Sequence, residues 1–228
     1  MKAFITLILV SIILSVSIIA SPVSPARADD EPSVGVKEGD WMEYDVNITG
    51  TPPTVHKDVV WMRIEVMQVE DTAFPVNLTV RCVNGTTSSS IWRFNFTAGN
   101  VGGWIIIPSN LGPGDMFFDN FSKTDNYITI QRQEQKTVLG ASRTVTYAND
   151  SYRHKEWDKA TGVFLGSSEI FKNWSAYVNM AATNLWDPQI LGLDQTMFYA
   201  IITVVVTAVV IGTLATTAAL RKKKWRNR

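Results

Sequence analysis

The residues able to support catalysis are few and scattered along the chain. There are two histidines, His56 and His154, and one cysteine, Cys82. None of them stands in the spacing of a zinc-protease helix, a nucleophile elbow or a cysteine-based metal site. His154 alternates with Tyr152 and Glu156 in a predicted strand, which is the usual setting of a structural histidine. We therefore expect a protein that is not an enzyme and that has no cofactor or metal.

One irregular segment is rich in side-chain oxygens. Asp115, Asp119, Asp125 and Asn126 could supply oxygen ligands to Ca²⁺. Their spacing does not fit the EF-hand loop, which also needs a glycine at its turn. The pattern favours a solvated acidic loop over a calcium site.

The most frequent chemical pattern in the chain is the acceptor sequence for N-linked glycosylation, Asn-X-Ser/Thr. Seven of the 13 asparagines fit it, although roughly two would be expected by chance at this serine and threonine content. N-glycosylation implies a surface position in an exported protein, so the excess predicts an exported glycoprotein. The predicted acceptors are Asn47, Asn77, Asn84, Asn95, Asn120, Asn149 and Asn173.

Hydrophobic alternation predicts which way these asparagines face. A period of two residues assigns three of them to the polar faces of predicted strands 42–48, 76–83 and 91–96, namely Asn47, Asn77 and Asn95. The same period assigns to the buried faces their neighbours Val46, Leu78 and Phe94. Asn84, Asn120 and Asn149 fall in turn-like stretches. Glycans at these positions would stay outside the core.

Between Trp41 and about Met180 the chain is rich in Val, Ile, Thr and aromatic residues, separated by Asn, Asp, Gly and Pro. This composition predicts about ten strands and no long amphipathic helix. The further predicted strands are 57–70, 103–108, 127–133, 136–147, 151–158 and 162–171. A tight hairpin is expected at 158–162, where Asp158 can accept a local hydrogen bond and Gly162 can adopt positive φ. Short turns predict an antiparallel meander forming a sandwich, a barrel or a curved half-barrel.

The N-terminal segment has the pattern of a secretory signal. Lys2 precedes an uncharged run from Ala3 to Ala20, and the small residues Ala26 and Ala28 follow. We expect a signal peptide over residues 1–28 and a mature chain that begins near Asp29. An uncleaved N-terminal anchor is the alternative, because the apolar run is longer than the usual signal core.

The C-terminal segment has the pattern of a membrane anchor. No charge occurs from Gln195 to Leu220, and the sequence predicts a transmembrane helix over 197–220 after a short linker, 191–196. Residues 221–228 hold six cations, so we expect them to stay in the cytoplasm. The stop-transfer cations are Arg221, Lys222, Lys223 and Lys224. The protein would then span the plasma membrane once, with residues 29–190 as an extracellular β-rich domain.

Small residues recur at four-residue intervals in the predicted membrane helix. Ala208, Gly212 and Thr216 would form one face that a second helix, from another copy or another protein, could approach closely. Small residues are also common in such helices without any partner. Membrane lipid is the partner that the sequence predicts most directly.

Charge and cysteine content narrow the class of protein. All 21 acidic residues lie between Asp29 and Asp194, together with 13 lysines and arginines, so this region has a net charge of −8. An acidic domain does not suit nucleic acid, which requires a basic surface. The single cysteine excludes an intramolecular disulfide. An exported domain without disulfides is typical of a prokaryotic surface, and we expect an archaeal one.

Two motifs carry a family resemblance. The segments Gly35-Val36-Lys37-Glu38-Gly39-Asp40-Trp41-Met42-Glu43-Tyr44 and Trp157-Asp158-Lys159-Ala160-Thr161-Gly162-Val163-Phe164-Leu165 resemble a frame found in exported, single-span archaeal cell-surface proteins of unknown function. This resemblance implies an opening strand and a late hairpin, and it implies no catalytic residue. The chain is more distantly similar to curved-sheet lipoprotein-carrier domains, whose concave face holds lipid or acyl chains.

The sequence is therefore compatible with three functions. The leading hypothesis is a non-enzymatic, membrane-anchored surface glycoprotein with a binding role or a role in organising the cell envelope. A domain that handles lipid or another hydrophobic ligand would need an apolar cavity. An envelope enzyme would need a cleft with polar groups of shifted pKa. The eight tryptophans could bind sugars or a partner where exposed, or could fill the core.

Overall fold

The computed structural model describes residues 32–53, 58–120, 127–149, 151–190 and 192–226, with side chains as far as Thr217. The predicted signal peptide, His56, Asp125, Asn126 and the side chains of the basic tail lie outside this description. The described part contains eleven strands and one long helix. They are β1 (Trp41–Gly50), β2 (Val59–Val66), β3 (Ala73–Cys82), β4 (Thr87–Asn95), β5 (Met116–Phe118), β6 (Tyr127–Thr129), β7 (Arg132–Val138), β8 (Ala141–Asn149), β9 (Arg153–Asp158), β10 (Phe164–Ile170), β11 (Trp174–Thr183) and α2 (Gln195–Arg226).

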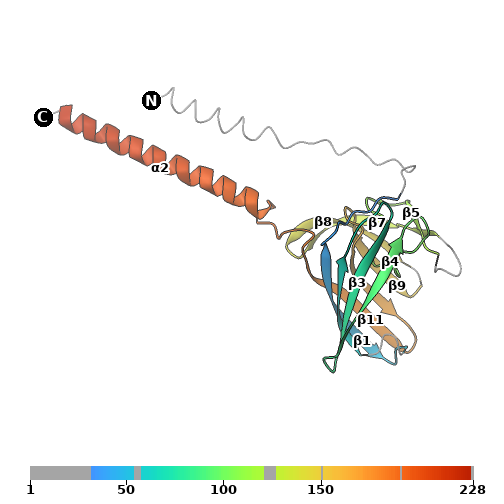
Figure 1. Ribbon diagram of the computed structural model, residues 1–228. Helices are drawn as coiled ribbons and strands as arrows, with labels where there is room; N and C mark the ends of the chain where they lie inside the picture. Colours follow the sequence, from blue (N-terminus) through green and yellow to red (C-terminus); the bar gives the residue numbers. More distant parts are fainter. Residues whose placement is uncertain (1–31, 54–57, 121–126, 150, 191, 227–228) are drawn as a thin grey trace. The chain divides into compact units, whose positions relative to one another are not determined.

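Nine strands form one antiparallel sheet in the order β4-β3-β2-β1-β11-β10-β9-β8-β7, and β5 pairs with β6. β1 pairs with both β2 and β11, so the two ends of the domain meet in the middle of the sheet. Among the described residues β4 and β7 are unpaired edges, so the sheet is open. Figure 1 shows β3 and β4 in front of β9 and β11, because the sheet curves. This confirms the predicted all-β meander with a C-terminal helix, and its form is closest to the curved half-barrel.

The alternation predicted from the sequence holds in the structure. Met42 and Tyr44 on β1 are fully buried, whereas Asp45 and Asn47 are exposed. On β3 and β4, Leu78 and Phe94 are buried as expected. The predicted strands therefore have the correct register where a polar face alternates with an apolar one.

Three predicted strands are wrong. Residues 127–133 are divided between β6 and β7, which lie in different sheets. Residues 103–108 do not form a strand. The backbone turns at 103–105, because Gly102, Gly103 and Trp104 have φ of 54°, 67° and 70°, and Ile106 makes only an isolated bridge to Val163. Residues 136–147 form two strands, because the chain reverses between Val138 and Ala141, where Leu139 and Gly140 also have positive φ. In these last two segments the apolar pattern continues through a turn, where the backbone is not extended.

The core lies between the inner face of the sheet and the segment after β4. Trp104 and Phe117 from that segment pack edge-on against each other, and both contact the fully buried Trp157 of β9. The Trp157 indole donates to the carbonyl of Trp104 at 2.7 Å. Tyr44 donates to the carbonyl of Phe164 at 2.8 Å, and burial raises the pKa of its hydroxyl well above the ordinary value. Burial of the Phe117 side chain, which is 2% exposed, contributes about 1.5–3 kcal/mol.

The predicted hairpin at 158–162 is confirmed. The Asp158 carboxylate accepts the backbone N–H of Thr161 at 3.0 Å and its hydroxyl at 2.7 Å. Gly162 follows with φ of 71°, and a Cβ there would lie 1.9 Å from the carbonyl oxygen of Ile107. Arg143 adds two hydrogen bonds of 2.8 Å to the same carboxylate, which is 1% exposed. The turn therefore depends on a buried, fully satisfied charge.

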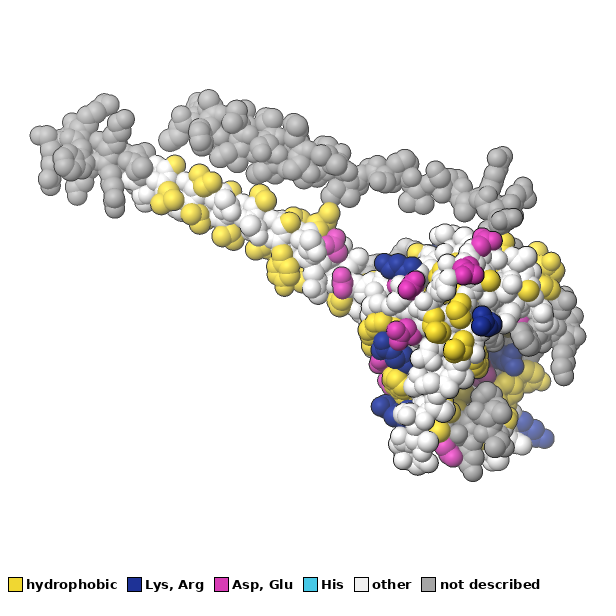
Figure 2. Space-filling view, viewed as in Figure 1, with side chains coloured by type: hydrophobic (Ala, Val, Ile, Leu, Met, Phe, Trp, Pro, Cys, Tyr) yellow, Lys and Arg dark blue, Asp and Glu magenta, His cyan; other side chains and the backbone are white. Residues whose placement is uncertain are grey.

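Helix α2 has the length and composition of a membrane span. Its apolar part, Gln195–Thr217, has 23 residues and extends roughly 34 Å at 1.5 Å per residue, enough to cross ~30 Å of hydrocarbon. Threonine hydroxyls along it donate to carbonyls one turn back, as Thr203 does to Tyr199 and Thr207 does to Thr203, both at 2.8 Å. These bonds would lower the cost of placing the hydroxyls in lipid. Figure 2 shows hydrophobic side chains along the visible side of the described part of the helix.

Candidate functional site

The predicted glycan acceptors all lie at the surface. Of these side chains, none is buried, and only Asn77 and Asn95 are part-buried. Asn84 lies in the turn between β3 and β4, and Asn173 lies in the turn between β10 and β11. The remaining acceptors stand on or beside strands, with exposed side chains at Asn47, Asn120 and Asn149.

The acceptor amides differ in which atom is engaged. In Asn84 and Asn95 the oxygen Oδ1 accepts a backbone N–H, from Thr86 and Ala98 respectively, both at 2.9 Å. Their nitrogens Nδ2, which would carry a sugar, donate to no atom in the described part of the chain. In Asn120 the nitrogen is engaged instead, because its Nδ2 donates to the carbonyl of Ala98 at 3.1 Å. Of these three, Asn84 and Asn95 are the better suited to a glycan.

Three aromatic rings stack in parallel at one end of the sheet. Phe171 lies between Tyr152 and Trp174, with ring centroids 5.6 and 4.4 Å away and planes within 15° and 16° of parallel. The turn that brings them together is held by hydrogen bonds from Phe171 N to Trp174 O and from Ile170 N to Tyr152 O. Tyr152 is 60% exposed. We call Tyr152, Phe171 and Trp174 the aromatic stack.

Charged groups stand next to the aromatic stack on the inner face of β9 and β10. Glu169 is paired with Arg153 in the ladder, with 3.9 Å between carboxylate oxygen and guanidinium nitrogen. The ammonium of Lys155 lies 3.4 Å from the same carboxylate and donates to the carbonyl of Gly103 at 2.9 Å. Polar groups that can bind hydroxyls therefore border the flat apolar rings.

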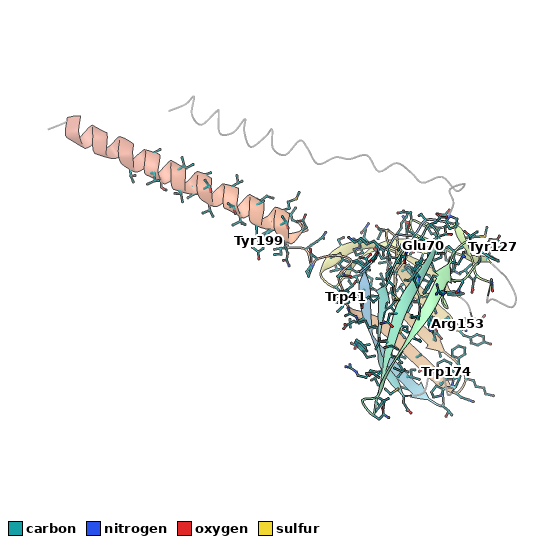
Figure 3. The ribbon with its side chains drawn as sticks, in the orientation of Figure 1. Trp41, Glu70, Tyr127, Arg153, Trp174 and Tyr199 are labelled. Atoms are coloured by element: carbon teal, nitrogen blue, oxygen red, sulfur yellow. The ribbon has the colours of Figure 1, made fainter. Side chains whose placement is uncertain are left out.

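The aromatic stack lies at the opposite end of β11 from the point where the chain leaves the sheet. β11 runs from Trp174 to Thr183, a distance of roughly 30 Å at ~3.3 Å per residue. In Figure 3, Trp174 lies at the other end of the domain from Glu70 and Tyr127. The aromatic stack is thus remote, along the strand, from the connection to α2.

The connection to α2 is fixed to the sheet for most of its length. Asn184 accepts the N–H of Trp41 at 2.7 Å, and Trp186 donates to the carbonyl of Val138 at 3.3 Å. Gln189 then pairs with the β7–β8 turn, donating its N–H to Gly140 and accepting that of Ser142. Only residues 190–194 separate this last attachment from α2.

The other residues singled out in the sequence have structural roles. Asp119 is buried and accepts the indole N–H of Trp104 at 2.6 Å, so a solvated acidic loop is wrong for this residue. Asp115 accepts the N–H of Gly112 at 2.7 Å. No cluster of three or more metal-binding side chains occurs among the described residues. Part-buried His154 bonds Asn149 at 2.5 Å, as expected of a structural histidine.

A charged network covers the outer face of β7 and β8. The hydroxyl of Tyr147 donates to Glu134 at 2.5 Å, and the Arg132 guanidinium lies 3.7 Å from the centroid of the Tyr147 ring. The hydrogen bond from Tyr147 lowers the pKa of the Glu134 carboxyl. Burial, followed by the same hydrogen bond, raises the pKa of the Tyr147 hydroxyl well above its ordinary value. Every charge here has a partner, and the network serves stability.

The sequence includes Trp174 among the eight tryptophans that could bind a sugar where exposed, but its pattern does not bring Tyr152 and Phe171 to this residue. The only local signal is the pattern Phe171-Lys172-Asn173-Trp174, in which two aromatic residues flank a turn. Searches of family models, curated proteins and solved structures found no match for this chain.

Proposed function

We propose that this chain is a non-enzymatic, N-glycosylated protein of the cell surface, anchored by α2, whose β domain binds a carbohydrate of the cell envelope through the aromatic stack. The signal peptide, the extracellular position of the β domain, the cytoplasmic basic tail and an archaeal plasma membrane belong to the same proposal. The observation that carries the binding role is the parallel stacking of Tyr152, Phe171 and Trp174, with a Tyr152 ring that is 60% exposed.

The chemistry of the aromatic stack suits a sugar. Parallel rings offer a flat apolar surface, and pyranose rings present flat faces of C–H groups that pack on such surfaces. Arg153, Glu169 and the exposed Lys172 stand close by, and they can bond the hydroxyls at the rim of a sugar ring.

The position of the stack suits a surface receptor. The chain is attached to the sheet as far as Gln189, and α2 begins at Gln195. With the membrane at that end of the chain, the stack at the start of β11 is held away from it. A lipid-handling role is less well supported, because it would need an apolar cavity. The side chains of Ile106, Phe117 and Trp157 instead fill the space against the inner face of the sheet.

The proposal is tested by binding of envelope polysaccharide to the detergent-solubilised protein, measured by calorimetry. The double variant Tyr152→Ala/Phe171→Ala should weaken binding at least tenfold, about 1.4 kcal/mol. Tyr127→Ala is the matched control, because Tyr127 is 58% exposed but lies in β6, away from the stack. Equal binding by the double variant and the control would refute the role of the stack.

A further inference from the structure

The two edges of the nine-stranded sheet are protected differently. β7 presents Arg132, Glu134 and Lys136 along its exposed length, and charges on an edge strand discourage pairing with another chain. β4 carries no charge from Thr87 to Trp92, and every residue in that range is exposed. An uncharged, extended edge of this length is a template for pairing with a second copy.

The backbone of β4 is available for such pairing. Asn95 and Asn100 exchange backbone hydrogen bonds of 3.0 and 2.8 Å on the side of β4 away from β3. Because peptide groups alternate in direction along a strand, those of Ser89 and Ile91 point to the same side. No strand in the described part of the chain pairs with them there. Ile91 and Trp92 are also 59% and 39% exposed.

Three predicted glycan acceptors surround this edge. Asn77 lies directly opposite Ile91 in the β3–β4 ladder, on the same face of the sheet. Asn84 lies in the turn that joins the two strands, and Asn95 is the last residue of β4. The β3–β4 hairpin thus holds three of the seven acceptors, whereas the charged β7–β8 hairpin holds only Asn149, at its end.

We infer that N-glycans on Asn77, Asn84 and Asn95 cover the β4 edge and prevent it from pairing with a second copy of the chain. A glycan is bulky and hydrated, so its attachment beside an edge strand blocks the approach of another backbone. The glycans would thus prevent β4 from pairing with another strand, as the charged side chains do at β7. The inference rests on the glycoprotein part of the proposed function.

The test compares two triple variants purified in detergent from the native host. The edge variant is Asn77→Gln/Asn84→Gln/Asn95→Gln, and the matched control is Asn47→Gln/Asn149→Gln/Asn173→Gln. Sedimentation should show self-association of the edge variant at a protein concentration at least tenfold below that of the wild type. The control should sediment as the wild type does. An edge variant that sediments as the wild type does would overturn the inference.

A rescue separates edge pairing from misfolding. Adding Ser89→Lys to the edge variant places a charge on the exposed edge and should restore wild-type sedimentation, which a misfolded protein would not regain. Continued self-association of the rescued variant would overturn the inference.

Mass spectrometry of the wild type distinguishes failure of the glycoprotein proposal from failure of the edge inference. Unmodified asparagines would refute the glycoprotein proposal as well, whereas modified asparagines with unchanged association would refute only the edge inference.

Discussion

Replacing Phe94 with alanine is expected to lower the free energy of unfolding by about 3–5 kcal/mol. The Phe94 ring is 2% exposed and stacks on Phe74 with ring centroids 5.0 Å apart. It also fills the space against Gly102, where a Cβ would lie 2.4 Å from the tip of the ring. Alanine would leave a cavity that this packed surrounding cannot close. Chemical denaturation of the detergent-solubilised protein, followed by tryptophan fluorescence, measures the effect.

The neighbouring residue supplies the control. Arg93 is exposed on the opposite face of β4, so Arg93→Ala should change the free energy of unfolding by no more than about 0.5 kcal/mol. A shift of one residue in register would exchange the two faces. Equal losses from the two substitutions would therefore contradict the orientation of β4.

Arg143→Ala is expected to cost on the order of 3–5 kcal/mol, because it leaves the Asp158 carboxylate buried without its cation. The two side chains share two hydrogen bonds of 2.8 Å, and Asp158 is 1% exposed whereas Arg143 is 22% exposed. The same carboxylate holds the 158–162 turn through Thr161. Denaturation under the same conditions measures the loss.

An exposed ion pair is the comparison for Arg143. Lys136 pairs with Glu156 at 2.7 Å, but its side chain is 44% exposed, so Lys136→Ala should cost about 0–1 kcal/mol. If Arg143→Ala were as mild as Lys136→Ala, the buried pair would not be holding the hairpin.

The sequence was informative wherever burial alternates along a strand. In β1 the polar residues Glu43, Asp45 and Asn47 alternate with Met42 and Tyr44, and only one register buries the apolar set. The 158–162 hairpin was predictable for a local reason as well, since Asp and Gly have specific roles in tight turns. Both features are determined by residues close together in the chain.

Two of the wrongly predicted strands include a stretch in which apolar residues do not alternate with polar ones. The apolar run Trp104-Ile105-Ile106-Ile107 resembles a strand. It begins in a turn after two glycines with positive φ, and its side chains fill the core without a strand being formed. Leu139 has φ of 46° in the β7–β8 turn, and an apolar residue gives no sign of a reversal. Periodicity cannot distinguish a buried strand from another buried segment.

The aromatic stack could not be predicted from local sequence patterns, for a different reason. Tyr152 precedes β9, whereas Phe171 and Trp174 flank the turn after β10, and only the pairing of β9 with β10 brings them together. The asymmetry of the sheet edges likewise depends on which strands are outermost. Strand order is a property of the whole chain, and these features follow from it.

The most direct test of the account is the topology of the protein in intact cells, because every surface role depends on it. If the proposed orientation is right, an epitope added after Arg228 should remain intact when external protease is applied, because the six cations in residues 221–228 would oppose transfer of that end across the membrane. The β domain, residues 29–190, should be digested or at least cleaved in its exposed loops. Loss of the epitope with an intact β domain would contradict the proposed orientation.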